Sequence, residues 1–209
     1  ILMKIEWRKA DKSLYLPGRK PEVIQVPEMS YFMLDGKGNP NNPEFSEAIE
    51  ALYSISYGVR TSHKSGNIPE GYYEYTVYPL EGIWSFEEDA RNDKVLNKDK
   101  LIYTLMIRQP DFVTKQFFME IVERTKKKKG NRLLDKVRYE RLDEGLNLQM
   151  MHIGSYDNEL ESFKLMEQYC IDNNLERIDK THKEIYVSDF RKTAPEKLKT
   201  VLRFKIKKK

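Results

Sequence analysis

An acid and a phenol lie on the same face of a predicted β-strand in the last third of the chain. In Glu184-Ile185-Tyr186-Val187-Ser188, the side chains of an extended segment alternate between two faces. Ile185 and Val187 are therefore predicted to face the core, while Glu184 and Tyr186 face the other way. This pairing predicts surroundings that are neither apolar core nor bulk solvent.

A similar pattern occurs earlier, in Glu74-Tyr75-Thr76-Val77-Tyr78. The acid again comes first, and an extended segment places Glu74 and Tyr78 on one face. Two related strands, each with a carboxylate and a phenol, predict a pocket with two chemically similar sides.

Aromatic residues are the second chemical feature. The chain has thirteen tyrosines, many on predicted strands, and Trp84 follows shortly after the first acid-bearing segment. Aromatic walls around a carboxylate suit flat or cationic organic molecules through stacking and cation–π attraction. We expect five residues to converge on one cleft: Glu74, Tyr78, Trp84, Tyr103 and Glu184. The alternative is that the tyrosines fill the core and its rim.

Missing motifs exclude several other chemistries. The sequence has no glycine-rich phosphate loop and no GxSxG nucleophile motif. Its three histidines, His63, His152 and His182, lack metal-ligand spacing, and one cysteine cannot build a zinc site. We therefore expect no metal and no cofactor. His182 is distinctive because it shares a predicted strand face with Glu184.

The composition predicts a globular protein of the cytoplasm. Charged residues make up 33% of the chain and hydrophobic ones 39%, which is more apolar than a disordered chain. The single Cys170 excludes an internal disulfide and suits a reducing compartment. No apolar run approaches the roughly 20 residues that cross a bilayer, so we expect no membrane association.

Basic residues form two runs within a net charge of +4. Lys126 to Lys129 end an amphipathic stretch, where cations offset the helix dipole, and Lys205 to Lys209 form a terminal tail. We therefore expect no direct nucleic-acid contact. The chain also lacks a heptad seam, and we expect a monomer.

The order of predicted elements is duplicated: strand, helix, strand, strand, then the same again. The first helix starts at Asn42-Pro43, and Asp157 caps the second. This order predicts an α+β fold with one antiparallel sheet of about eight strands, built from two pseudo-two-fold-related halves. The helices are expected on one face and a ligand cleft on the other.

We expect a single domain over residues 3–209. Its halves span about 22–110 and 140–207, and a helical connector spans 111–139. The periodicity of residues 132–141 predicts a short helix there.

Four segments carry a family resemblance: KLIYTLMIRQPDFVT, HIGSYDNE, HKEIYVSDFR and EKLKTVLR. They resemble the stand-alone branch of the GyrI-like small-molecule-binding proteins, also met as effector domains of multidrug-sensing transcription regulators. The resemblance covers Glu28 to Arg203. It implies the duplicated fold, an aromatic cleft, and Glu184 as the central pocket glutamate. His152, in the second segment, joins the ligand-binding candidates.

Three functions remain open at this stage. Some stand-alone members of the family hydrolyse cyclopropane-bearing DNA alkylators, which implies a detoxifying hydrolase here. Glu184 would activate water, and Tyr186 or another tyrosine of the cleft would stabilise the developing oxyanion. The second function is non-catalytic sequestration or sensing of planar or cationic xenobiotics. The third is inhibition of a DNA-handling enzyme, which the balanced charge does not favour.

Overall fold

The predicted α+β class is confirmed. In the computed structural model, which describes residues 3–87 and 95–209, nine strands belong to one antiparallel sheet. The chain divides into two compact units. Unit 1 contains Ile1–Trp7, Met29–Leu80 and Phe86–Leu142. Unit 2 contains Arg8–Glu28, Glu81–Ser85 and Asp143–Lys209.

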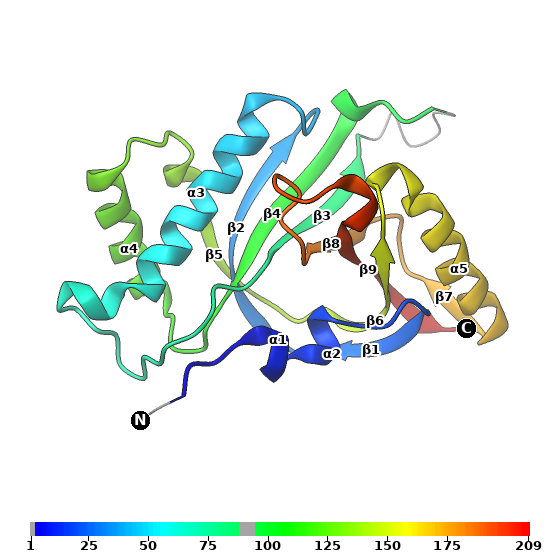
Figure 1. The fold of residues 1–209 in the computed structure, drawn as a ribbon, viewed down its shortest axis with the longest axis horizontal. Helices are drawn as coiled ribbons and strands as arrows, with labels where there is room; N and C mark the ends of the chain where they lie inside the picture. The colour runs from blue at the N-terminus through cyan, green and yellow to red at the C-terminus, as the bar shows by residue number, and fades with distance from the viewer. Residues whose placement is uncertain (1–2, 88–94) are drawn as a thin grey trace. The chain divides into compact units, whose positions relative to one another are not determined.

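In unit 1 a central strand pairs with a strand on each side. β2 (Met29–Lys37) lies between β4 (Leu101–Gln109) and β5 (Arg138–Leu142). The helix α3 (Pro43–Arg60) packs against β2, β4 and the helix α4 (Lys115–Lys128) (Figure 1). α3 begins at Asn42-Pro43 as predicted.

In unit 2 five strands lie side by side and one helix covers part of them. The strand order is β1 (Glu22–Val26), β6 (Gly145–Ile153), β9 (Lys199–Lys208), β8 (His182–Tyr186) and β3 (Leu80–Phe86). A short strand, β7 (Leu175–Arg177), pairs with β9. The helix α5 (Glu159–Asp172) packs on β6 and β7 (Figure 1). Its buried Met166 and Cys170 join an apolar core that includes Leu148, Leu202 and Phe204.

The remaining elements are single turns. Two short helices, α1 (Trp7–Ala10) and α2 (Lys12–Tyr15), precede β1. The 3-10 turns are η1 (Ser62–Ser65), η3 (Lys98–Lys100), η4 (Leu134–Lys136), η5 (Tyr156–Asn158) and η6 (Pro195–Lys197). No helix among the described residues is long and apolar enough to cross a membrane.

The duplicated element order is present, because β2-α3-β3-β4 is followed later by β6-α5-β8-β9, with the short strand β7 added between α5 and β8. The predicted helix over residues 132–141 is wrong. Only η4 is helical there, and β5 follows it. Pairing with β2 outweighs the local helical preference of these residues.

The predicted strand over residues 74–78 is also wrong. Tyr75 makes an isolated bridge to Ile5, and the neighbouring residues lie outside the named strands. Pro79 follows, and it has no N–H to donate to a strand ladder. The strand begins only at Leu80, so the acid carried by the first half's strand is Glu81.

Candidate functional site

The pairing of β3 with β8 determines which side chains share a face. Gly82 lies opposite Glu184, and Trp84 lies opposite His182. Opposed residues of an antiparallel pair point to the same side, so Trp84, His182 and Glu184 belong to one face. Gly82 has no side chain, so β3 places no side chain directly opposite Glu184.

A chain of hydrogen bonds ends at Glu184. The indole N–H of Trp84 donates to the hydroxyl of Tyr186 over 2.8 Å. That hydroxyl donates to Glu184 Oε2 over a longer 3.4 Å. The rings of Tyr156 and Phe190 meet the ring of Tyr186 edge-on, with centroids 6.2 and 5.7 Å away. The structure therefore brings together the predicted residues Trp84, Glu184 and Tyr186 in an aromatic setting.

A second carboxyl group, which the sequence did not reveal, contacts Glu184. Glu159 is the first residue of α5, and its carboxyl hydrogen-bonds with that of Glu184. Burial raises the pKa of Glu159 well above its usual range, and the charge of Glu184 raises it further. Glu159 therefore keeps its proton under conditions where an exposed glutamate is ionised.

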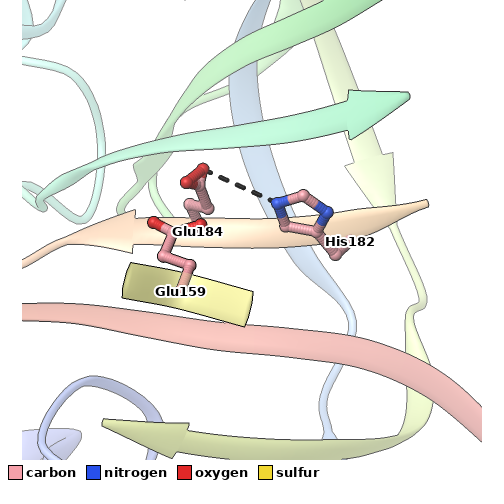
Figure 2. A group of neighbouring side chains, drawn as sticks. All are labelled: Glu159, His182 and Glu184. Carbon is pink, nitrogen blue, oxygen red and sulfur yellow. Dashed lines mark ion pairs between the residues drawn. The ribbon is translucent and has the colours of Figure 1, made fainter. Parts of the chain in front are cut away.

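The third member of this cluster is His182. Its Nε2 lies 3.7 Å from Glu184 Oε2, and its ring meets Phe163 of α5 edge-on at 4.8 Å. Figure 2 shows Glu184 and His182 on β8, with Glu159 beside them on α5. The cluster therefore lies on the side of β8 that faces α5. The ligand cleft had been expected on the face without helices, and this cluster does not lie there.

The cluster has the atom types of a metal site. Among the described residues, Glu159, His182 and Glu184 offer ligand atoms within 4.8 Å of one another. Such atoms suit Zn²⁺, and Glu159 Oε1 and His182 Nε2 are buried without a hydrogen-bond partner among the described residues. Because the pKa of Glu159 is raised, the arrangement also fits acid–base chemistry.

The two tyrosines whose pKa values are raised by the charge of Glu184 are Tyr186 and Tyr156. Burial raises the pKa of Tyr186 well above its usual range, and the charge of Glu184 raises it further. Burial and the charges of Glu184 and Glu159 also raise the pKa of Tyr156. Because both phenols hold their protons, they can stabilise a negative charge but do not act as bases.

His152 is buried, and hydrogen bonds occupy both of its ring nitrogens. Nε2 donates to the carbonyl of Ser155 over 2.9 Å. Nδ1 is then left to accept from the hydroxyl of Ser162 over 2.7 Å. These bonds link β6 to the start of α5, where Glu159 lies. In this structure His152 thus holds the helix end that carries Glu159.

The other three predicted site residues belong to unit 1. The side chain of Glu74 is 62% exposed and lies 3.9 Å from His63 Nε2. The ring of Tyr78 is buried, with the guanidinium of Arg108 over its face at 4.4 Å. Tyr103 is buried too, and its ring lies against Gly36, its cross-strand partner. None of these contacts involves Glu184.

The opposite face of β8 carries a buried ion cluster. Lys183 is only 4% exposed, and its ammonium lies 2.7 Å from Glu144 and 3.0 Å from Glu81. Glu81 comes from β3, and Glu144 precedes β6. Lys183 thereby links β8 to β3 and to the residue before β6, and it stabilises the strand register that places Trp84 beside Tyr186.

Glu159 could not be recognised from its local sequence. An acid in the first turn of a helix ordinarily complements the helix dipole, and only packing of α5 beside β8 brings it to Glu184. His182 was detectable, because the spacing His-x-Glu-x-Tyr places three polar side chains on one strand face.

Several solved structures have a fold similar to that of this chain. It aligns with a hydrolase from Listeria innocua at 36% identity, with a TM-score of 0.89, over 98% of this chain and 100% of that one. An uncharacterised conserved protein from the same organism aligns at 38% identity, with a TM-score of 0.91 and the same coverage. The C-terminal domain of EcmrR shares the fold at 14% identity, with a TM-score of 0.52, over 91% of this chain and 98% of that one.

No curated protein matches the sequence at a significant level. The model of the GyrI-like small molecule binding domain, however, matches residues 19–207. This range contains both repeats of the fold and every residue of the carboxyl cluster. The chain therefore belongs to the GyrI-like small-molecule-binding family.

Proposed function

We propose that the protein binds flat, hydrophobic or cationic xenobiotics and hydrolyses cyclopropane-bearing DNA alkylators, a detoxifying reaction. The observation that carries this proposal is the Glu159–Glu184 pair, in which two buried carboxyls lie together beside Tyr186 and Trp84 and the pKa of Glu159 is raised by burial and by the charge of Glu184. Because its pKa is raised, Glu159 supplies a protonated acid beside the Glu184 carboxyl. A protein that only binds ligands would not need a protonated acid at this position.

The reaction adds one water molecule across a strained ring. Glu184 accepts a proton from water, and the water oxygen bonds to a carbon of the cyclopropane. The ring C–C bond breaks, and its electron pair moves through the conjugated system to a carbonyl oxygen. That oxygen takes up a proton, so the product contains the elements of water and no cyclopropane. The pair is restored when Glu184 passes its proton to solvent.

The neighbouring aromatic residues bind the ligand and stabilise charge in this proposal. Trp84, of which 8% is exposed, would supply its indole ring for stacking against a flat molecule. Tyr186 donates a hydrogen bond either to Glu184 or to the oxyanion that develops during ring opening. Contributions of Glu74, Tyr78, Tyr103 and His152 to ligand binding remain predictions, and for His152 the geometry supports a positioning role.

The hydrolase from Listeria innocua, 36% identical over nearly the whole chain, supports the assignment to hydrolysis in general. The choice of cyclopropane-bearing compounds comes from the resemblance to the stand-alone branch of the family. A buried carboxylate among aromatic rings also favours a second candidate, sequestration of cationic planar compounds without reaction.

The decisive experiment is incubation of the protein with a cyclopropane-bearing alkylator, followed by mass spectrometry of the small molecule. Hydrolysis predicts a time-dependent increase of a product heavier by one water, at amounts exceeding the protein. Sequestration predicts unchanged alkylator released on denaturation. A covalent adduct on the protein, without free product, would contradict the hydrolase proposal.

A further inference from the structure

A small basic cavity lies in unit 1, apart from the carboxyl cluster described above. It has a volume of about 140 Å³, and its lining includes Lys4, Arg60, Lys64, Tyr72 and Glu74. Pockets for drug-sized ligands are roughly 300–1,000 Å³, so this one suits only a compact molecule. We propose that it is a binding site for a phosphate group.

Three of the lining residues are permanent cations contributed by separate segments. Lys4 comes from the N-terminal segment, Arg60 from the last position of α3, and Lys64 from η1. Within the described part of the chain, no ion pair is formed by any of the three. The lining therefore carries more positive than negative charge.

These cations are not needed to cap the end of α3. A helix C-terminus has unpaired carbonyls that often attract basic side chains. Here the hydroxyls of Thr61, Ser62 and Tyr72 each donate to a carbonyl of the last turn, over 2.8, 2.8 and 2.6 Å. Because hydroxyls already satisfy these carbonyls, the basic groups remain available to a ligand.

Arg60 is held in place within the cavity. Its Nε donates to the carbonyl of Tyr75 over 3.1 Å, which fixes the guanidinium while its terminal nitrogens can still donate. A guanidinium presents paired donors that match the oxygens of phosphate, and lysines add point charges. Two lysines around one fixed arginine thus form a phosphate site.

Glu74 gives the cavity a property that can be tested. Its carboxylate lines the cavity and lies 3.9 Å from His63 Nε2. A nearby carboxylate repels a phosphate and attracts a cation. Removal of this charge should therefore strengthen binding if the ligand is an anion and weaken binding if it is a cation.

The test is a titration of the whole chain with inorganic phosphate, at constant ionic strength maintained with chloride, followed by ¹H–¹⁵N NMR. We expect saturable shifts around Lys64 and Tyr72. Lys4→Gln and Lys64→Gln should each weaken binding about tenfold, as expected for loss of a charge-assisted contact. Glu74→Gln should tighten it. Lys164→Gln, an exposed lysine on α5, is the matched control and should have no effect.

Two results would overturn the proposal. Chloride alone could reproduce the shifts, which would mean that the cavity responds only to ionic strength. Alternatively, Glu74→Gln could weaken binding, which would make the cavity a cation site. Lys4 and Lys64 are both exposed, so their substitution leaves the core intact and either result is interpretable.

Discussion

Glu159 on α5 and Glu184 on β8 are joined by a hydrogen bond between their carboxyl groups. Both side chains are buried, with 9% and 7% of their surface exposed. Burial and the charge of Glu184 raise the pKa of Glu159 well above its usual range. The pair thus places a protonated acid beside a second carboxyl group, and the proposed function rests on this property.

Replacement of Glu184 by Gln tests the base directly. The change preserves the shape of the side chain and removes its ability to accept a proton. If the protein is a hydrolase, turnover should fall by about 10²–10⁴-fold, while binding of a neutral planar ligand changes little. Steady-state product formation and ligand binding, measured on the same preparation, separate these effects.

Glu161→Gln is the matched control for that experiment, because Glu161 is an exposed acid in the first turn of α5. The Glu161→Gln variant should hydrolyse the alkylator at the wild-type rate.

A sequestering protein would behave differently, since Glu184→Gln would weaken binding of cationic ligands and leave binding of neutral ligands unchanged. Undiminished hydrolysis in Glu184→Gln would exclude Glu184 as the base.

Replacement of Glu159 by Gln should stabilise the protein while lowering its activity. The pKa of Glu159 is raised in the folded state by burial and by Glu184. Its contribution to stability is therefore fully present below the unfolded pKa, about 4.3, and is lost as the pH rises through the folded pKa. Gln mimics the protonated acid, so the free energy of unfolding of the variant should not fall as the pH rises through the pKa of Glu159. Urea unfolding from pH 4 to pH 8 measures the difference.

In that series the wild-type protein should lose stability relative to Glu159→Gln as the pH rises. A constant difference between the two proteins across this range would mean that Glu159 is ionised normally. The raised pKa of Glu159, and with it the proposed acid–base pair, would then be wrong.

The alternation of side chains along a strand correctly predicted that part of the candidate site lies on one face of β8. His182, Glu184 and Tyr186 lie on one strand face because extended side chains alternate, a property of the local backbone. Trp84 joined them because β3 pairs with β8 in the register Trp84 to His182. The duplicated order of elements also followed from sequence, since helix starts such as Asn42-Pro43 are local signals.

The errors have a common physical cause. Residues 74–78 alternate like a strand, but Tyr75 bridges to Ile5 and Pro79 interrupts the ladder, so tertiary contacts decided their conformation. Glu159 was missed for the same reason, because its role depends on where α5 packs. Local patterns predict which face a side chain takes, whereas nonlocal packing determines its partner.

Ligand binding should quench the fluorescence of Trp84. The chain has two tryptophans, and the indole of Trp7 donates to the carbonyl of Val77 over 3.0 Å within unit 1. In a Trp7→Phe variant, a planar cationic compound should lower the remaining emission in a saturable manner, since the ligand stacks near Trp84. Fluorescence titration gives the dissociation constant directly.

The reciprocal variant, Trp84→Phe, keeps Trp7 as its only tryptophan and should show no such quenching. It also loses the 2.8 Å hydrogen bond to Tyr186, which should cost about 1 kcal/mol of unfolding free energy. Equal quenching in both variants would place the ligand away from Trp84.

Substitution of Lys183 by Met should strongly destabilise the protein at neutral pH. Lys183 is buried between Glu81 and Glu144, and its removal leaves two carboxylates without their cation. Breaking a buried ion pair in this way typically costs about 3–5 kcal/mol. Burial alone would raise the pKa of Glu144, but the charge and hydrogen bond of Lys183 lower it.

The pH dependence of that variant follows from the lowered pKa of Glu144. In the wild-type protein this group's contribution to stability is present above its unfolded pKa and is lost as the pH falls through its folded pKa. The deficit of Lys183→Met should therefore be largest near pH 7 and shrink in acid, where the unpaired carboxylates become protonated. Adding Glu81→Gln and Glu144→Gln should restore part of the stability at pH 7. Lys180→Met is the control, because Lys180 is exposed, and it should change the free energy of unfolding very little. If Lys183→Met has an equally small effect on the free energy of unfolding, the ion cluster does not hold β8 in place.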